Sequence, residues 1–232
     1  MTFITAVIPV YNDVEALKTA IPKSLEVLEG FGRAFEIIVA EDGSTDGSRE
    51  LVEEWAKKDA RVRLLHSDAR QGRGRALNRA LSEARGDIFC YYDVDRATDM
   101  KHLPELLMHI EDGADVATGS RLMKTSNIKR SGDREIASRG YNFLVRRLLK
   151  SKLCDHQCGF KAYKVPVLRE LVKQIQAPHW FWDTESLILA QRAGYRVDEF
   201  PVVWTQGPGT TVRFKDVKEM GIDILKLRKR LT

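Results

Sequence analysis

The chain has few cysteines and no long apolar stretch. Its three cysteines, Cys90, Cys154 and Cys158, cannot all pair within one chain, and no basic and apolar leader is present, so we expect a reducing, cytoplasmic compartment. Cys154 and Cys158 lack the spacing of zinc ligands and a second ligand pair, which favours small packing residues. No run approaches the roughly 18 to 20 apolar residues that span a bilayer, so any membrane contact is expected to be peripheral.

Acidic residues are outnumbered by basic ones, and the formal net charge is +5. On charge alone, the partner is a nucleic acid, an anionic membrane surface or a nucleotide phosphate. The sequence has no zinc-finger or aromatic RNA-binding signature, so we expect no nucleic-acid partner. With 232 residues, of which 43% are hydrophobic, the chain is long enough for a sizeable core. We expect a single domain over residues 1–232.

Apolar runs alternate with helical periodicities through the first hundred residues. The predicted strands cover residues 4–10, 36–40, 62–66 and 88–92, and the predicted helices cover residues 14–28, 48–58 and 71–85. This alternation predicts an α/β fold with a doubly wound, mostly parallel sheet. The rest is less regular: we expect a helix over residues 103–111, a strand over 115–119, two further helices and a basic C-terminal helix over 217–231.

Two carboxylates, Asp93 and Asp95, directly follow the apolar run that ends at residue 92. Mg²⁺ and Mn²⁺ prefer oxygen ligands, and Mg²⁺ is usually held by one or two carboxylates and by the phosphates of a substrate. The pair therefore predicts a metal site for a phosphorylated substrate. Two aspartates at this spacing also occur in solvated turns and helix caps, so this interpretation depends on the residues around them.

Other polar residues follow the predicted strands at the same edge of the sheet, where open parallel sheets bind their ligands. Asp42 follows the second strand and suits a donor group on a base or ribose, although a glycine-rich turn before a helix has the same composition. Gly72 and Arg75 belong to a basic turn that opens a helix. Its backbone N–H groups and guanidinium groups suit a diphosphate, and the alternative is a solvated helix start.

Together these residues resemble the family 2 glycosyltransferases, which have the Rossmann-like GT-A fold. Residues 7–12 are similar to that family's opening strand, residues 41–48 to its nucleotide turn, and Asp93-Val94-Asp95 to its metal motif. Residues 119–121 and 155–163 resemble, more narrowly, the polyprenyl-phosphate (dolichyl-phosphate) hexose synthases.

The segments 182–185, 193–197 and 201–204 resemble the glucosyl branch of those synthases more than the mannosyl branch. The mannosyl enzymes commonly have glutamine where this chain has Ala97, so the resemblance supplies no third metal ligand.

The resemblance implies an inverting transfer of a hexose from a nucleotide sugar, with UDP favoured and GDP as the alternative, to a polyprenyl or dolichyl phosphate, assisted by Mg²⁺ or Mn²⁺. Asp93 and Asp95 would hold the metal, and Asp183 would orient the sugar hydroxyls or the acceptor. The expected catalytic residues are Asp93, Asp95, Asp183 and Arg121. The expected donor-binding residues are Pro9, Tyr11, Asn12, Asp42, Ser44, Gly72, Arg75 and Lys161.

By the same resemblance, Arg121, Arg134 and Ser138 would bind the acceptor phosphate. Arg134 and Ser138 are four residues apart and so share a helix face, and the alternative is surface charge on a basic helix. For Lys161 the alternative is a surface lysine. We assign residues 1–98 to the nucleotide sugar, and residues 99–232 to the acceptor and the C-terminal helix.

Two basic helices with interleaved apolar residues, over residues 139–150 and at the C-terminus, are candidates for contact with a membrane surface or a membrane partner protein at the cytosolic face. The pattern of the first is more often that of an ordinary core face with a solvated back, and that of the second is equally typical of a dimer or partner helix. Residues 179–182, with two tryptophans, suit an acceptor-facing or interfacial wall. Two other functions stay open: the same fold with a soluble acceptor or a nucleotidyl transfer, and a non-catalytic basic binding module.

Overall fold

The computed structural model describes residues 2–207 and 214–231. Its strands are β1 (Phe3–Val10), β2 (Ala34–Glu41), β3 (Val62–Leu65), β4 (Ile88–Tyr92), β5 (Val116–Ser120), β6 (Asn127–Lys129), β7 (Phe160–Lys164), β8 (Val197–Pro201) and β9 (Val203–Thr205). Its helices are α1 (Val14–Phe31), α2 (Ser48–Lys58), α3 (Arg73–Glu83), the 3₁₀ helix η1 (Met100–His102), α4 (Leu103–Glu111), α5 (Gly132–Leu149), α6 (Val165–Val172), α7 (Phe181–Arg192) and α8 (Phe214–Leu231).

Among the described residues, seven strands form one sheet in the order β3-β2-β1-β4-β7-β5-β8, and β6 and β9 form a separate pair. β1 is parallel to β2 and β4, β2 to β3, and β5 to β8, which confirms the mostly parallel sheet. β7 runs antiparallel between β4 and β5. β7 was not predicted as a strand, because Lys161 and Lys164 interrupt its apolar pattern and Lys161 is nevertheless fully buried.

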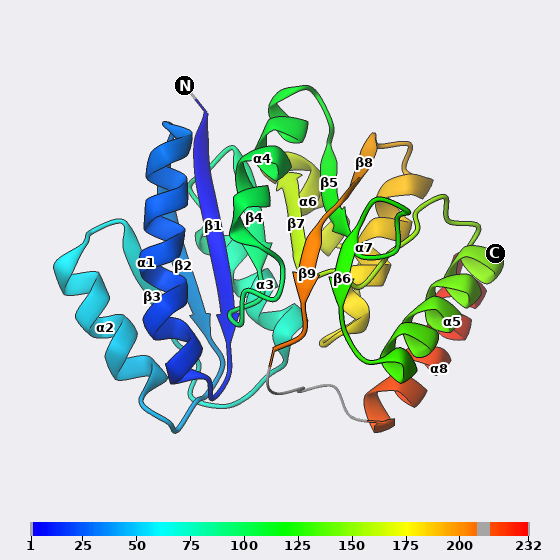
Figure 1. Cartoon of the computed structure of the whole chain (residues 1–232), viewed down its shortest axis with the longest axis horizontal. Coiled ribbons are helices and arrows are strands. Elements are labelled where there is room, and N and C mark those ends of the chain that lie inside the picture. The colour runs from blue at the N-terminus through cyan, green and yellow to red at the C-terminus, as the bar shows by residue number, and fades with distance from the viewer. Residues whose placement is uncertain (1, 208–213, 232) are drawn as a thin grey trace.

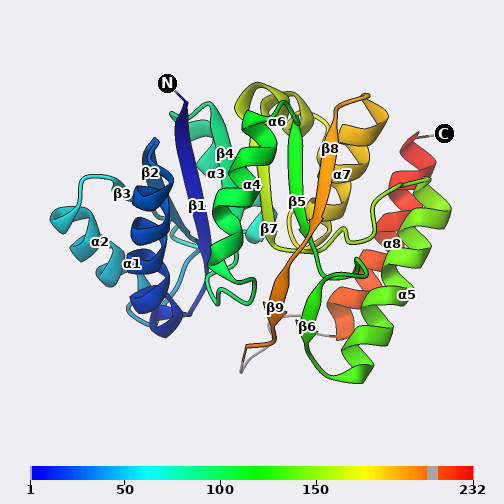
Figure 2. The same ribbon diagram turned by 45° about the horizontal axis from the view of Figure 1, so that its top comes forward.

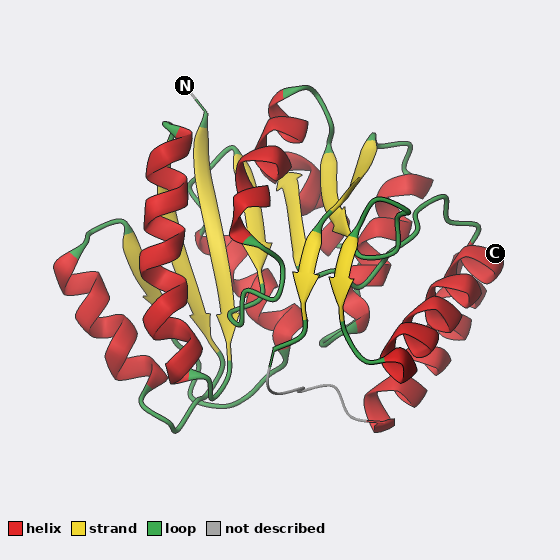
Figure 3. Cartoon of the chain, viewed as in Figure 1, coloured by secondary structure: helices red, strands yellow, loops and turns green. Residues whose placement is uncertain are grey.

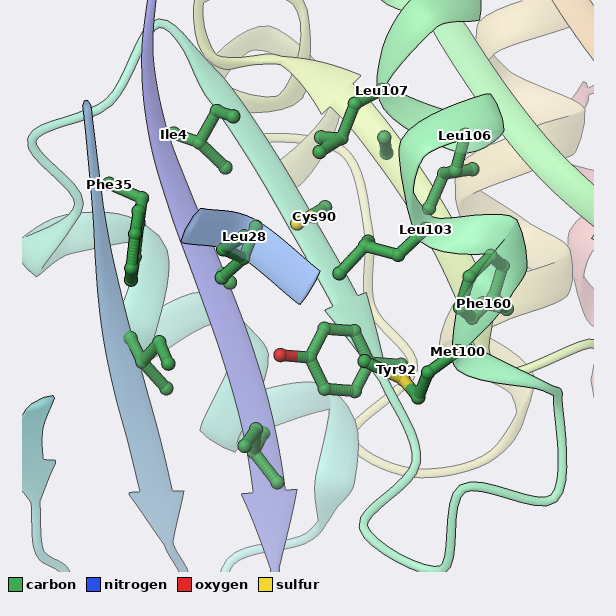
Figure 4. Close-up of a cluster of buried hydrophobic side chains, with 14 of the residues drawn as sticks. Ile4, Leu28, Phe35, Cys90, Tyr92, Met100, Leu103, Leu106, Leu107 and Phe160 are labelled. Atoms are coloured by element: carbon green, nitrogen blue, oxygen red, sulfur yellow. The ribbon is translucent and has the colours of Figure 1, made fainter. Parts of the chain in front are cut away.

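Helices cover both faces of the sheet (Figures 1 and 3). α1, α2 and α4 pack on one face, and α3, α6 and α7 pack on the other. Figure 4 shows the first of these cores, in which Leu103 and Leu107 of α4 lie near Ile4 of β1 and Tyr92 of β4. Burial of these apolar side chains is the main force that fixes the strands, and hence their ends, relative to one another.

α5 and α8 lie side by side at one end of the molecule, as the two views in Figures 1 and 2 both show. They join α7 in a third, smaller apolar cluster that contains Val145, Ile188 and Ile224. None of the helices in residues 2–207 and 214–231 combines the length and the apolar character needed to cross a bilayer.

The strand order reverses between β1 and β4, because the chain runs outward from β1 through β2 to β3 and then returns to the other side of β1. Ligands of open α/β sheets bind beyond the carboxyl ends of the strands at such a reversal. The carboxyl ends of β1, β2 and β4 lie together at the lower edge in Figure 1. This edge is therefore where the predicted site residues are to be sought.

Candidate active site

Asp42, just beyond β2, holds the turn that begins α3. Its carboxylate accepts the backbone N–H of Gln71 at 3.1 Å and that of Gly72 at 2.8 Å, and Arg79 Nη1 at 3.2 Å. Gly72 has φ 109°, and a Cβ there would lie 2.6 Å from the Pro178 oxygen, so only glycine fits this turn. Asp42 is only 4% exposed. Its carboxylate thus fixes the turn in this structure, and its contact with a base or ribose stays a prediction.

The end of β1 is tied to the turn after β2. Pro9 is buried within β1, and Asn12 has a left-handed φ of 50°, which asparagine tolerates. The Asn12 backbone N–H donates to Ser44 Oγ at 3.0 Å. The Arg70 guanidinium lies 4.0 Å from the centre of the Tyr11 ring, in a cation–π contact. Four of the predicted donor-binding residues are thus neighbours at one edge of the sheet.

Asp93 and Asp95 follow β4 in a tight turn, in which the Arg96 backbone N–H donates to the Asp93 carbonyl at 3.0 Å. The side chain of Asp93 is 41% exposed, and Asp95 is exposed. Gly159 lies against Asp93: its carbonyl accepts the Asp93 backbone N–H at 3.1 Å, and a Cβ at position 159 would lie within 2.5 Å of all three carboxyl-group atoms of Asp93. Although the Asp95 side chain reaches solvent, neighbouring protein atoms exclude part of the water around its carboxylate. This partial desolvation, and secondly repulsion from Asp93, raise the pKa of Asp95. The two carboxylates therefore form a concentrated negative charge.

Arg73, the first residue of α3, joins Asp93 to Asp183. Its Nη2 is 2.8 Å from Asp93 Oδ1, and its Nη1 is ion-paired with Asp183 Oδ2. Its guanidinium carbon lies 5.2 Å from the centre of the Tyr91 ring and 5.6 Å from that of Trp180. The basic turn was predicted as a candidate diphosphate site, but Arg75 was chosen as its site residue in place of Arg73, which directly follows Gly72.

Asp183, at the start of α7, accepts two further hydrogen bonds. The Tyr91 hydroxyl donates to its Oδ1 at 2.6 Å, and Lys161 Nζ lies 2.8 Å from the same oxygen. Burial alone would raise the pKa of Asp183, but Arg73 and Lys161 outweigh it and hold the pKa below its usual value. A carboxylate in this state is a weak base and a strong hydrogen-bond acceptor.

The structure corrects three expectations for this region. The alternative of Lys161 as a surface lysine fails, since it is fully buried between Asp183 and the Cys158 carbonyl. Trp182 is not part of an exposed wall: it is fully buried, and it meets the Tyr91 and Tyr163 rings edge-on. The backbone N–H of Arg75 is not available to a diphosphate in this structure, because it donates to the Pro178 carbonyl at 3.2 Å. The Arg75 side chain is exposed.

The three residues predicted for the acceptor phosphate lie on two different segments. Arg121, just after β5, is paired with Asp155 through Nε at 2.7 Å and Nη2 at 2.9 Å, and its guanidinium carbon is 5.8 Å from the Trp204 ring centre. Arg134 and Ser138 are half-buried on α5, about two turns and one turn, respectively, before the buried Asn142. They therefore share the inner face of α5, as the spacing predicted.

The carboxylates present fit a divalent cation whose coordination is completed by a substrate. Among the described residues there is no cluster of three or more His, Cys, Asp or Glu side chains placed to bind a metal. Asp93 and Asp95 alone match the one or two carboxylates with which Mg²⁺ is usually held beside phosphate oxygens. Ala97, whose backbone N–H donates to Asp95 Oδ1 at 3.0 Å, adds no side-chain ligand.

Comparisons with known proteins identify relatives of this chain among the glycosyltransferases. A sequence model described as "Glycosyl transferase family 2" matches residues 5–172. Glycosyltransferase AglD of Haloferax volcanii is 46% identical over 99% of this chain, which spans only 37% of AglD. Human dolichyl-phosphate beta-glucosyltransferase is 28% identical over 98% of this chain and 75% of its own length.

Among solved structures, glucosyl-3-phosphoglycerate synthase from Mycobacterium tuberculosis, in complex with Mn²⁺, UDP and glucosyl-3-phosphoglycerate, superposes with a TM-score of 0.70. The match covers 98% of this chain and 80% of that one at 20% sequence identity. At this identity the likeness concerns the fold, and it confirms the predicted GT-A architecture.

Proposed function

Since the chain belongs to glycosyl transferase family 2, we propose that it transfers a hexose, with inversion, from a nucleotide sugar to the phosphate of a polyprenyl or dolichyl carrier. A UDP-sugar is favoured over a GDP-sugar because of the resemblance to the glucosyl branch. Support for the acceptor comes from relatives named dolichyl-phosphate beta-glucosyltransferase, which match 97–98% of this chain at 26–28% identity. Residues 1–98 would hold the donor, and residues 99–232 most of the acceptor site.

The observation that carries the proposal is the convergence of Asp93, Arg73 and Asp183 at the β1–β4 reversal, 20 and 110 residues apart along the chain. A phosphate acceptor is already ionised near neutral pH, so the transfer needs orientation and charge neutralisation rather than a strong base. Asp183 suits this demand: its pKa is lowered, and its oxygens accept hydrogen bonds. It would orient sugar hydroxyls or the acceptor.

Asp93 and Asp95 would hold the divalent cation, Mg²⁺ or Mn²⁺. A bound divalent cation neutralises the charge that develops on a departing nucleoside diphosphate. Of the other predicted donor-binding residues, Tyr11, Asn12, Asp42, Ser44 and Gly72 would shape the nucleotide pocket through ring contacts, hydrogen bonds and close backbone approach. Lys161 acts on the donor side only through Asp183, because its ammonium group is fully buried.

On the acceptor side, Arg121 would present the edge of its guanidinium that Asp155 leaves open, and Arg134 and Ser138 would approach from α5. Asp155 fixes the guanidinium plane through two hydrogen bonds, which prepares it for an anion. Burial by itself would lower the pKa of Arg121, but the charge of Asp155 and its hydrogen bonds outweigh that effect and leave the pKa raised, so Arg121 stays charged.

The protein would meet its lipid substrate as a peripheral protein at the cytosolic face of a membrane, directly or through a membrane partner. Large apolar side chains are exposed on α5, where Ile136 is 74%, Phe143 66% and Leu144 46% exposed. Ile222 and Leu225 are exposed on α8. Basic residues accompany them, among them Arg139, Arg146, Arg147, Lys150 and Lys226. Apolar residues beside basic ones suit an anionic interface.

The test is transfer of radiolabel from UDP- and GDP-hexoses into an organic-extractable lipid, with purified protein, polyprenyl phosphate and Mn²⁺ or Mg²⁺. We expect labelling with one donor, lost on adding EDTA and in Asp95→Asn. Phosphoglycerate and other soluble phosphates serve as competing acceptors in parallel reactions. Labelling of a soluble acceptor alone would replace the lipid in this proposal, and lipid labelling unaffected by EDTA would remove the metal.

A further inference from the structure

Arg73 is held in one position by contacts on every side. Its side chain is only 8% exposed, it pairs with Asp93 and Asp183, and it lies near the rings of Tyr91 and Trp180. Gly72, directly before it, is fixed by Asp42 and Pro178. An arginine keeps its charge at all ordinary pH values and binds carboxylates with a planar fork. Arg73 is therefore a permanent cation built into the carboxylate cluster.

The Arg73 fork engages one of the two Asp93 oxygens that are available to a metal. Nε and Nη2 of Arg73 lie 3.2 and 2.8 Å from Asp93 Oδ1. Oδ2 of Asp93 lies against the backbone of Gly159, where even a Cβ would not fit. A cation that approaches Asp93 thus meets a carboxylate with one oxygen already paired and the other partly enclosed.

The charges of the cluster also disfavour a divalent cation that binds at Asp93 by itself. Asp93 and Asp183 are ion-paired with Arg73 and Lys161, and Asp95 interacts electrostatically with Asp93 and Arg73, so these five side chains together carry one net negative charge. A divalent cation alone would reverse that sign. A diphosphate brings further negative charge, and its oxygens are alternative partners for a guanidinium fork.

We propose that Arg73 is a positioning residue that occupies Asp93 in the donor-free protein, so that a divalent cation binds strongly only together with the donor diphosphate, which takes Arg73 from Asp93. This inference rests on the proposed metal site and extends it to the order of binding. Arg73 would thus act through Asp93 on the metal, and directly on the diphosphate once the donor is present.

The test measures the affinity for Mn²⁺ alone, by electron paramagnetic resonance of free Mn²⁺, in folded wild-type protein, R73Q, D93N and R73Q/D93N. We expect R73Q to bind Mn²⁺ on the order of tenfold more tightly than wild type, which corresponds to about 1.4 kcal/mol. In the wild-type background, D93N should change the Mn²⁺ affinity less than about threefold. In R73Q/D93N, the increase in Mn²⁺ affinity that R73Q gives alone should disappear. R79Q is the matched control, because Arg79 pairs with Asp42 rather than Asp93.

The same titrations are repeated with UDP. Mn²⁺ affinity of the wild type should rise at least tenfold, and D93N should remove most of that rise. If R73Q does not fold, the comparison of D93N with wild type tests the proposal by itself. A loss of Mn²⁺ affinity in D93N that is equal with and without UDP would overturn the role of Arg73. An unchanged Mn²⁺ affinity in folded R73Q would also overturn it. Hexose transfer by the wild type is assayed alongside: no transfer with the expected Mn²⁺ pattern refutes the proposed function and leaves the role of Arg73 supported.

Discussion

Replacement of Gly159 by alanine is the sharpest test of the site geometry. The added methyl group would lie within 2.5 Å of all three carboxyl-group atoms of Asp93, whereas ordinary contact begins near 3.4 Å. The Asp93 carboxylate therefore has to move by roughly 1 Å, and a displacement of that size at a reacting centre costs about 100-fold in rate. Gly159 has no positive φ, so backbone strain contributes nothing to this expectation.

The loss should appear in activity far more than in stability. Asp93 is 41% exposed and can swing toward solvent, so we expect the free energy of unfolding to fall by no more than about 1 kcal/mol. Gly30→Ala is the matched control, because a Cβ at position 30 in α1 meets nothing within 4 Å. That variant should keep full activity and gain a few tenths of a kcal/mol of helix stability.

A double-mutant cycle identifies the route of the effect. Gly159→Ala should reduce hexose transfer about 100-fold in the wild-type background and only a few-fold in Asp93→Asn, where the carboxylate is already lost. Thermal unfolding of all four proteins is measured in parallel. Transfer by Gly159→Ala within twofold of wild type would refute the reasoning, as would an equal loss in both backgrounds.

Three further predictions concern the scaffold and its surface. Burial lowers the pKa of His156 to about 3, so below about pH 6.5 this histidine is protonated in the unfolded chain but stays neutral in the folded one. The free energy of unfolding should therefore fall by about 2 kcal/mol from pH 7.5 to pH 5. In urea titrations, His156→Gln should make the free energy of unfolding less dependent on pH. Trp182→Ala should destabilise by about 3–5 kcal/mol in the same assay, because the ring is fully buried; a loss below 1 kcal/mol would contradict the packing described. Phe143→Ser should leave the unfolding curve unchanged within about 0.5 kcal/mol while weakening sedimentation with anionic vesicles several-fold, and equal sedimentation would remove α5 from the membrane contact.

The elements of the first hundred residues follow from sequence pattern because each is a local signal. The predicted helix over residues 48–58 and the strand over 88–92 match α2 and β4, and the periodicity of α1 was recognised although the helix extends to Phe31. The strand β7 was missed because burial of Lys161 depends on Asp183, 22 residues further on. The turn that contains Arg73 was recognised, but Arg75 was chosen over Arg73, because both ion-pair partners of Arg73 come from distant segments of the chain.

Residues from both sides of position 98, the predicted boundary between the donor half and the acceptor half, contribute to the same cluster. Asp183 and Lys161, from the second part, complete the cluster around Arg73 and Tyr91, from the first. Long-range pairs of this kind leave no periodic trace in the sequence. They arise because β7 inserts beside β4 and brings α7 back over the face that α3 covers.

This buried cluster stabilises the protein and sets the geometry of the site through the same ion pairs. Lys161 has no exposed side-chain surface, so removal of Asp183 leaves its buried ammonium group without a carboxylate partner among the described residues, at a cost of about 3–5 kcal/mol. A variant at Asp183 therefore changes folding and catalysis together, and lost activity there does not by itself assign a chemical role. Asp95 is different, because it is exposed and its carboxylate accepts only the backbone N–H of Ala97 among the described donors. Asp95 is thus the position at which the contribution of charge to catalysis separates from its contribution to stability.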